Sequence, residues 1–468
     1  MPGLPATYAR LVAEAPSSSF GAAARVDAAT PMPRPGPGEV LVRIHWAGVN
    51  GGCETFRARG EQGTPFARHQ QAREPYPLGA EGSGVVVARG PGVGPLLPLG
   101  QAVAVNTAAA FAEYALAKAA SCTPVREATA AATAVTLSAL TAAAALGPQQ
   151  GGGGGGGGAA CTGARVTPGC AVVVTTAAGG AGHFALQYAR LYGAGKVVAV
   201  VGSERKARWL RDEFWPLVLK GGEGAAAAAA AAAPAQQQQQ GEAGPGQVSA
   251  VQTDELVVVD YSEYLPRGGG GGTEGEAALA AALRAACGDG RAGADVVFEG
   301  VGGAVGRACV QALAPGGVSL QVGYISEYPH TTTAEGGAGK EEGGKNGAAD
   351  AAKATTAATA GAQDGGGAAA AAAASITGTT ARPPNAELFW KGLDVDLGEG
   401  RRVTGAVWPR DAVAIGAAKR RVFDDFNCGL LVAATHAAPG LRGVAAAPEA
   451  VALMLRGEHV GKFVVPIL

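Results

Sequence analysis

The sequence predicts a two-domain α/β protein, in which a compact domain of short strands precedes a doubly wound parallel sheet. Short apolar segments separated by Gly and Pro turns occupy the chain from about residue 39 to residue 115. From residue 163 onwards, apolar segments alternate with segments of helical period, which is typical of a parallel sheet with helices on both faces. Tracts of one or two residue types interrupt this second region without breaking its alternation.

The first domain is expected to contain several short strands and one helical segment. The predicted strands cover residues 39–50, 80–88, 100–105 and 110–115. The alanine-rich stretch 126–146 is expected to be helical. Gly-rich turns between the strands favour a compact, mostly β domain.

The second domain is expected to alternate strands and helices. The predicted strands are Ala171–Thr175, Lys196–Val201, Leu256–Val259, Asp295–Phe298 and Gly317–Val322, with Leu393–Trp408 as the last strand. The predicted helices are Gly182–Leu191, Arg205–Phe214, Glu276–Cys287 and Ala304–Leu313. A helix at Pro448–Arg456 and a strand at Gly461–Pro466 are expected to close the chain.

Low-complexity tracts lie between the predicted elements. They bury too little apolar surface to offset the entropy of ordering them, so we interpret them as disordered loop expansions. The resulting division of the chain is a first domain at 1–147, a Gly-rich insertion at 148–162, a second domain at 163–410 with insertions at 216–250, 267–275 and 331–382, a variable insertion at 411–445, and a C-terminal return to the first domain at 446–468.

Composition narrows the function classes. The net charge is −1, so no general attraction to nucleic acid or to an anionic membrane is expected. No apolar run reaches the length of a membrane span. Seven scattered cysteines without a CxxC pair indicate thiols in a reducing compartment. The N-terminal residues lack a basic-then-apolar signal, which makes the cytoplasm the default location and leaves targeting to an organelle open.

The stretch VVVTTAAGGAGHFALQ, residues 172–187, has the pattern of a phosphate-binding turn. A buried strand is followed by small residues and then by a helix that begins at Gly182. Because Gly179, Gly180 and Ala181 carry no large side chain, backbone N–H groups could approach a pyrophosphate. The helix dipole would favour the negative charge of the pyrophosphate. The flanking strand and helix distinguish this turn from the other glycine tracts.

The end of the second strand favours NADP over NAD. In dinucleotide folds, an acid about 20 residues past the glycines binds the ribose diol of NAD. Here the strand ends at Gly202, and Ser203, Arg205 and Lys206 follow. A hydroxyl and two cations suit a 2′-phosphate. The alternative is a solvated helix start, in which Glu204 serves the helix dipole.

Several stretches together resemble the medium-chain dehydrogenase/reductase superfamily, in its quinone oxidoreductase and enoyl reductase branch. They run from about residue 38 to the C-terminus and skip the insertions. The shared stretches are GVN at 48–50, AEGSGVV at 80–86, FAEY at 111–114, TTAAGGAG at 175–182, VDY at 259–261, DVVFEGVGG at 295–303, GYISEY at 323–328 and GKFVV at 461–465.

The resemblance implies a GroES-like catalytic domain interrupted by a Rossmann domain, with NADPH between them. It implies Ala181 at the pyrophosphate and Lys206 at the 2′-phosphate, beside Gly202 or Ser203. The other implied nucleotide contacts are Tyr261 at the adenosine end, Gly300, Val322 and Tyr328 along the sheet edge, and Ala406, Val407, Trp408 and His459 near the nicotinamide half. By analogy, it also allows a homodimer.

The residues argue against zinc. Zinc members of this superfamily carry a Cys where this chain has Asn50, and a His-Glu pair where it has Ala80-Glu81. Neither alanine nor the spacing of the six histidines provides three zinc ligands. Cys53 is interpreted as an ordinary loop thiol.

Without zinc, reduction of an activated C=C bond suits the site better than reduction of a carbonyl. A hydrogen-bond donor must then meet the carbonyl oxygen, and Tyr328 is the candidate from the Ile-Ser-x-Tyr motif. Asn50 is expected to orient the substrate or the nicotinamide amide. The alternatives are a structural tyrosine and a turn asparagine.

The predicted activity is NADPH-dependent reduction of small-molecule α,β-unsaturated ketones or aldehydes, such as alkenals or 15-oxoprostaglandin-like enones. A quinone reductase on the same fold is the second hypothesis. A non-enzymatic NADPH-binding protein, with its insertions serving interactions, is the third.

Overall fold

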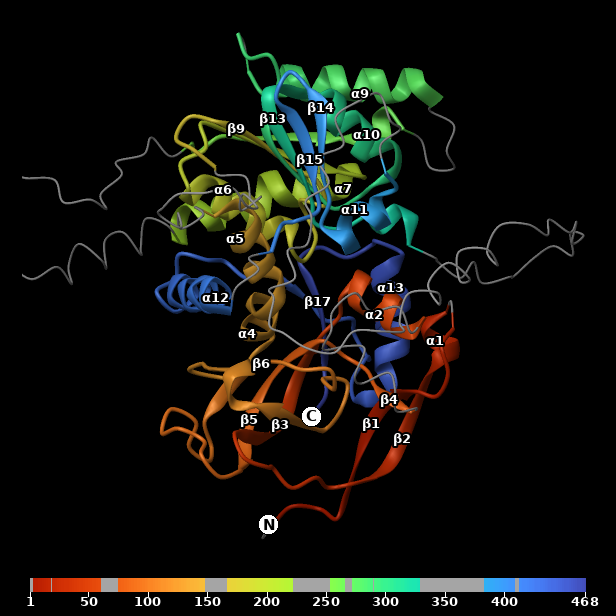
Figure 1. Cartoon of the computed structure of the whole chain (residues 1–468), viewed down its shortest axis with the longest axis vertical. Coiled ribbons are helices and arrows are strands. Elements are labelled where there is room, and N and C mark those ends of the chain that lie inside the picture. Colours follow the sequence, from red (N-terminus) through yellow and green to blue (C-terminus); the bar gives the residue numbers. More distant parts are fainter. Residues whose placement is uncertain are drawn as a thin grey trace, which may run out of the picture.

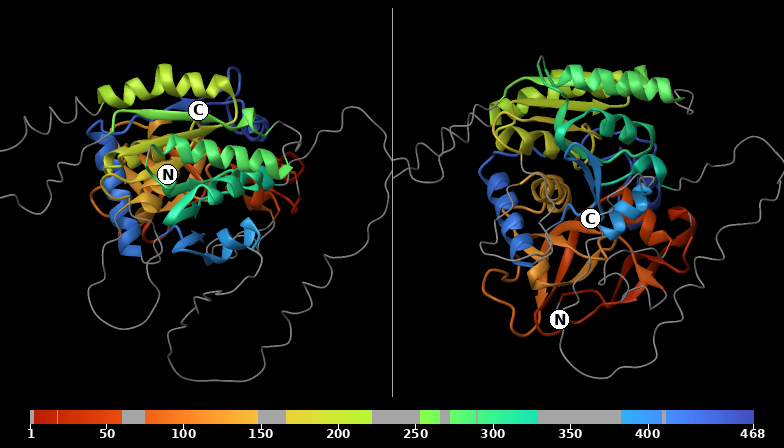
Figure 2. Two further views of the ribbon diagram at one scale, coloured as in Figure 1. Left: turned by 90° about the horizontal axis from the view of Figure 1, so that it is seen from above. Right: turned by 45° about the horizontal axis from the view of Figure 1, so that its top comes forward.

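The computed structural model divides into two lobes (Figures 1 and 2). The lobe that carries the N-terminus is built around antiparallel strands, and the other is built around a mainly parallel sheet with helices on both sides. The structure describes residues 3–17, 19–59, 75–147, 166–221, 253–265, 272–288, 290–328, 383–408 and 412–468. The predicted insertions at 148–162 and 331–382, and most of 216–250 and 267–275, lie outside these residues. No described helix is long and apolar enough to cross a membrane.

The first lobe contains a sheet that the end of the chain completes. Its strand order is β16-β17-β3-β5-β6-β8, and β7 also pairs with β3. β17 runs antiparallel to β3, with Val464 opposite Gly48. The strands are β3 (Glu39–Gly48), β5 (Glu81–Arg89), β6 (Ala102–Asn106), β7 (Tyr114–Lys118), β8 (Cys122–Pro124), β16 (Thr435–His436) and β17 (Lys462–Pro466). The predicted strand at 110–115 begins later, at Tyr114.

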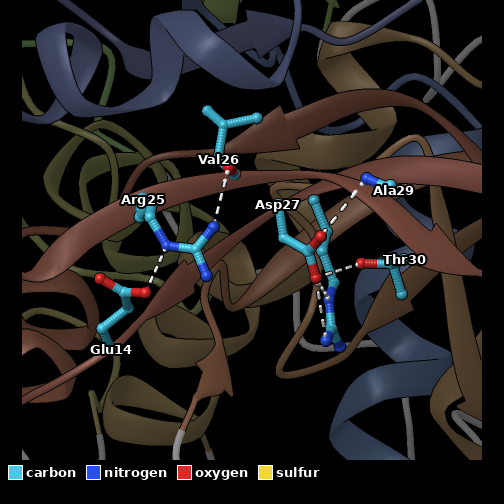
Figure 3. Close-up of polar contacts among 7 residues, drawn as sticks. Glu14, Arg25, Val26, Asp27, Ala29 and Thr30 are labelled. Atoms are coloured by element: carbon cyan, nitrogen blue, oxygen red, sulfur yellow. Dashed lines mark hydrogen bonds and ion pairs between the residues drawn. The ribbon is translucent and has the colours of Figure 1, made fainter.

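A second, three-stranded sheet at the N-terminus does not follow from the sequence pattern. It orders β2 (Ala24–Pro31), β1 (Thr7–Ala13) and β4 (Tyr76–Pro77), and α1 (Phe20–Ala23) precedes β2. Polar contacts fix the β1–β2 pair (Figure 3). Arg25 donates to Glu14 over 2.5 Å, while Asp27 accepts from the Thr30 hydroxyl at 2.6 Å. Alanines dilute the strand pattern here, because alanine has low β-propensity.

The second lobe is a doubly wound sheet with strand order β11-β10-β9-β12-β13-β15-β14. All neighbours are parallel except β14 and β15. The last predicted strand, at 393–408, is therefore an antiparallel hairpin. The strands are β9 (Ala171–Val174), β10 (Lys196–Val201), β11 (Leu256–Asp260), β12 (Ala294–Glu299), β13 (Leu313–Gln321), β14 (Asp394–Gly398) and β15 (Arg401–Thr404).

Alternate side chains of the central strand β9 enter two different cores. Val172 and Val174 pack with α5 (Leu140–Leu146) and α6 (Gly182–Leu191), whereas Ala171 and Val173 pack with α9 (Gly272–Ala286) and α10 (Gly303–Gln311). A strand buried on both faces has no polar alternation. This arrangement confirms the predicted fold class. The remaining helices are α2 (Gly51–Ala58), α4 (Ala130–Ala134), α7 (Glu204–Arg208), α11 (Asn385–Lys391), α12 (Ala412–Asn427) and α13 (Ala447–Leu455), with a π-helical turn (Val135–Ala139) joining α4 to α5.

The segment interpreted as a variable insertion at 411–445 contains α12 and β16. Val422 and Phe423 of α12 are buried in the core that also holds α5 and α6. Asp425 accepts a hydrogen bond from the hydroxyl of Tyr188 on α6 at 3.2 Å. Beyond α12, Gln187 bonds both backbone groups of Val432. This segment therefore packs as part of the fold. Its many alanines and charged residues make the short apolar face of α12 difficult to recognise in the sequence.

We expect Phe423→Ala to lower the free energy of unfolding by about 3–5 kcal/mol, because it would leave a cavity under α12. The matched control is Val413→Ala on the same helix, where the side chain is 78% exposed and the change should stay within about 0.5 kcal/mol. Urea denaturation followed by circular dichroism measures both. Equal, small changes would contradict the packing described for α12.

Candidate functional site

A cleft of about 830 Å³ lies between the two lobes. It is lined by the carboxyl ends of β9, β10 and β12, by α2, and by the segment that joins α13 to β17. A crevice outside the carboxyl ends of parallel strands, where the strand order reverses, is where such sheets bind ligands. β9 lies at this reversal, between β10 and β12.

The backbone of the glycine turn after β9 leaves no space for a side chain at Gly182. Thr176 adopts a positive φ of 49° and its carbonyl accepts from Gly179 N–H at 2.7 Å. A Cβ on Gly182 would lie 2.1 Å from that same carbonyl oxygen, so only glycine fits there. The turn leads directly into the N-terminus of α6, whose dipole faces the cleft.

His183, which the sequence analysis did not select, supports this turn from below. Its Nδ1 lies 2.8 Å from the carbonyl oxygen of Gly179, and its Nε2 accepts from Ala434 N–H at 3.3 Å. Burial lowers the pKa of His183 to about 4. The ring is therefore neutral near pH 7 and carries its proton on Nδ1, where it donates to the turn.

The adenosine end predicted for a nucleotide has Gly202, Tyr261 and Lys206 together on the cleft. A Cβ on Gly202 would lie 2.4 Å from the Tyr261 hydroxyl oxygen. An acid that selects a ribose diol therefore has no space at position 202. Ser203 lies away from the cleft and caps α7 by accepting from Lys206 N–H at 3.4 Å. Arg205 is bonded to the Glu458 carbonyl.

The charged side chains that line the cleft are all cationic. They are Arg57, Lys206, Arg456 and Lys462, and no Asp or Glu joins them among the described residues. The whole chain carries 37 Lys and Arg against 38 Asp and Glu, so this bias belongs to the cleft and not to the composition. An anionic ligand fits such a surface.

Asn50 forms part of a buried charge cluster with Glu81 and Lys462. The Lys462 ammonium lies 2.6 Å from Glu81 Oε1 and donates to Asn50 Oδ1 at 2.5 Å. Asn50 Nδ2 donates to the same Glu81 oxygen at 2.8 Å, and the backbone N–H of Leu137 donates to the other at 2.7 Å. Lys462 and Glu81 are almost fully buried, so the carboxylate is matched by a cation and by two further donors.

Tyr328 lies at the opposite end of the cleft from Lys206, beside the N-terminus of α2. A Cβ on Gly52 would lie 3.0 Å from its hydroxyl oxygen. Burial raises the pKa of Tyr328, so the hydroxyl keeps its proton over the working range of pH. Phe56 meets its ring edge-on at 5.1 Å.

Most of the predicted site residues meet in this cleft. Those that line it are Asn50, Gly179, Gly180, Ala181, Gly202, Lys206, Tyr261, Gly300, Val322, Tyr328, Trp408 and His459. Gly182, Ser203, Ala406 and Val407 do not line it. His459 lies close enough to Lys206 for that cation to lower the pKa of the imidazole, after burial as the main cause. Lys462, Arg57 and Trp390 line the cleft without having been predicted, because each stands alone in the sequence.

Glu54 is a buried acid next to the Asn50 cluster. It lies on α2, is fully inaccessible to solvent, and neither carboxyl oxygen has a hydrogen-bond partner among the described residues. Burial raises its pKa to about 7, and the nearby cations Arg57 and Lys462 only partly oppose this shift. The carboxyl is thus protonated below about pH 7, where an exposed glutamate is ionised.

The comparisons with known proteins agree with this geometry. Residues 36–160 match the alcohol dehydrogenase GroES-like domain. Prostaglandin reductase-3 of Mus musculus is 26% identical over 330 residues, which cover 70% of this chain and 67% of that protein. These matches support the predicted resemblance to the medium-chain dehydrogenase/reductase superfamily.

Other members of this superfamily are similar over different lengths. A probable quinone oxidoreductase of Leishmania amazonensis is 31% identical over 175 residues, covering 37% of this chain and 45% of that protein. A mycobacterial protein whose structure was solved in complex with NADPH has a TM-score of 0.56 and 20% identity, over 98% of this chain and all of that one, which shows the same fold. The predicted resemblance and the GroES-like domain are confirmed.

The raised pKa of Glu54 predicts a loss of stability with rising pH. The folded acid holds its proton up to about pH 7, whereas the unfolded one releases it near 4.3. The free energy of unfolding should therefore fall by about 3 kcal/mol between these values, at 1.36 kcal/mol per pKa unit.

Glu54→Gln should remove this component, and the exposed Glu127→Gln should not. Urea denaturation at pH 4.5, 5.5, 6.5 and 7.5 measures the difference between wild type and each variant. A Glu54→Gln curve parallel to that of wild type would contradict the buried, protonated carboxyl.

Proposed function

We propose that this protein is a zinc-independent oxidoreductase that uses NADPH to reduce the C=C bond of α,β-unsaturated ketones or aldehydes. One observation carries the proposal. One cleft, whose charged lining is all cationic, connects a glycine turn to a tyrosine hydroxyl and a partly buried amide. The first part suits a dinucleotide, and the second suits a small carbonyl compound.

The chain's own residues fit NADPH. The turn offers the backbone N–H groups of Gly180 and Ala181, and the N-terminus of α6, to a pyrophosphate. Lys206 would meet the 2′-phosphate, with the Tyr261 hydroxyl beside it over Gly202. Gly300, Val322 and Trp408 supply apolar surface along the sheet edge. The mycobacterial neighbour complexed with NADPH supports the same choice of nucleotide.

Zinc independence rests on the chemistry of the residues present. Asn50 and Ala80 replace two side chains that zinc members of the superfamily use, and Glu81 is already bound to the Lys462 ammonium at 2.6 Å. A divalent cation at this place would face a fixed positive charge. Lys462 and Asn50 would instead provide fixed electrostatic support at the cleft wall.

Bound NADPH supplies a hydride. The task of the chain is then to hold the enone with its β-carbon facing the nicotinamide and to stabilise negative charge on the carbonyl oxygen. Tyr328 would donate its hydroxyl proton in a hydrogen bond to that oxygen. Asn50, fixed by Glu81 and Lys462, would orient the carboxamide or the substrate. A proton that reaches the α-carbon from solvent completes the saturated product.

A quinone is the second candidate substrate. The relative named probable quinone oxidoreductase is 31% identical over its matched segment. The apolar end of the cleft around Tyr328 suits a quinone as well as an enone. The two are separated by comparing kcat/KM for an enone and a quinone in the same assay.

The proposal predicts that purified protein oxidises NADPH in the presence of an enone, as followed at 340 nm. Tyr328→Phe should lower kcat about 100-fold or more, the effect of removing one donor to a developing oxyanion. Tyr324→Phe is the matched control, because its hydroxyl accepts from Trp390 and does not line the cleft. It should change kcat by only a few-fold.

No NADPH oxidation with a broad panel of enones and quinones would contradict the proposed reaction. An unaltered kcat in Tyr328→Phe, with NADPH binding unchanged, would assign Tyr328 a structural part only.

A further inference from the structure

A group of aromatic rings, which we call the aromatic wall, lies at the end of the cleft around Tyr328. Phe56, Tyr328, Phe389 and Trp390 line the cleft, and Tyr324 packs against these rings without lining it. Phe56 lies at its centre and meets Tyr328 edge-on at 5.1 Å and Trp390 edge-on at 4.9 Å. These rings come from α2, from the segment after β13, and from α11, so three separate parts of the chain converge on one spot.

Two glycines, Gly51 and Gly52, let the start of α2 lie close to Ile325 and Tyr328. A Cβ on Gly51 would lie 3.2 Å from the Ile325 side chain, and one on Gly52 would lie 3.0 Å from the Tyr328 hydroxyl. Both are contacts tighter than ordinary packing. A larger residue at either position would displace Ile325 or Tyr328. The glycines therefore allow α2 to pack closely against the aromatic wall.

The aromatic wall presents no charge to a ligand. The Trp390 indole N–H is bonded to the Tyr324 hydroxyl at 2.7 Å. Arg57, the nearest cation on α2, donates to the carbonyls of Gly79 and Ala108. Lys462 is bound to Glu81. Arg57 and Lys462 are therefore already bonded to protein groups, while the Tyr328 hydroxyl and Asn50 line this end of the cleft.

We infer that the aromatic wall selects uncharged, aryl-substituted enones, whose ring packs against Phe56 and Trp390 while the carbonyl faces Tyr328. This inference rests on the proposed reductase function and names its substrate class. An aromatic pair gains about 0.5–1.5 kcal/mol beyond its buried area, which at 1.4 kcal/mol per factor of ten corresponds to a preference of up to about tenfold. A carboxylate on the ring would be desolvated beside Arg57 and Lys462, which are already bonded to protein groups.

The test compares three substrates under saturating NADPH: 4-phenylbut-3-en-2-one, its para-carboxylate, and dec-3-en-2-one, which has the same number of carbons as the first. Wild type should show kcat/KM about five- to tenfold higher for the phenyl enone than for the alkyl enone, and lower values for the carboxylate. Phe56→Leu and Trp390→Leu should each bring the phenyl-to-alkyl ratio close to one. Trp209→Leu, whose ring stacks on Phe214 outside the cleft, should leave the ratio unchanged.

A binding measurement separates this inference from the reaction. Calorimetry with NADP⁺-loaded protein should show tighter binding of 4-phenylbutan-2-one than of decan-2-one in wild type, and equal binding in Phe56→Leu. If no enone is reduced but this binding preference holds, the reaction is wrong and the aromatic wall stands. Equal kcat/KM and equal affinity for phenyl and alkyl ligands, or a preference that both wall variants retain, would overturn the inference.

Discussion

The buried contact between Lys462 and Glu81 is the interaction on which the rest of the site depends. It joins β17, the last strand of the chain, to β5 of the first lobe. The same lysine reaches Asn50 at the start of α2, and its side chain lies against Gly180 of the nucleotide turn. The ammonium of Lys462 therefore holds groups of the first lobe, while its methylene stem lies against the turn of the second lobe. Removing either charge would leave the other buried without a partner, which is strongly destabilising.

Burial favours the uncharged form of two titratable side chains near this contact, His183 and Glu54. His183 loses its charge because it is buried, and Glu54 keeps its proton for the same reason. Glu81 and Lys462 then form the one fully buried ion pair among the described residues. The Lys462 ammonium is thus paired with Glu81 and provides fixed electrostatic support at the cleft wall.

Sequence patterns predicted the elements whose signal is strong and local. The strand at Val172 and the helix after Gly182 follow from apolar runs flanked by glycine, and Gly202 with Lys206 follows from the spacing within a dinucleotide fold. The N-terminal sheet and α12 were not predicted, because alanine-rich segments carry weak periodicity. Their burial comes from tertiary packing, as the 3% exposure of Phe423 shows.

The cleft residues that the sequence did not predict share one property. Each contacts a residue that lies far away in the sequence. Lys462 lies 381 positions after Glu81 in the sequence, and no local pattern links them. Phe56 and Trp390 meet only because α2 and α11 face the same end of the cleft. Conversely, Ser203 carries a plausible phosphate-binding hydroxyl in the sequence, yet the structure uses it to cap α7.

The central claim is that a lysine ammonium, and not a metal, supports the reacting end of the cleft. The most direct measurement is the rate of NADPH-dependent enone reduction after dialysis against a chelator, with zinc content determined by mass spectrometry. The account predicts an unchanged rate at a zinc content far below one ion per chain. A loss of activity on chelation that added zinc restores would contradict it.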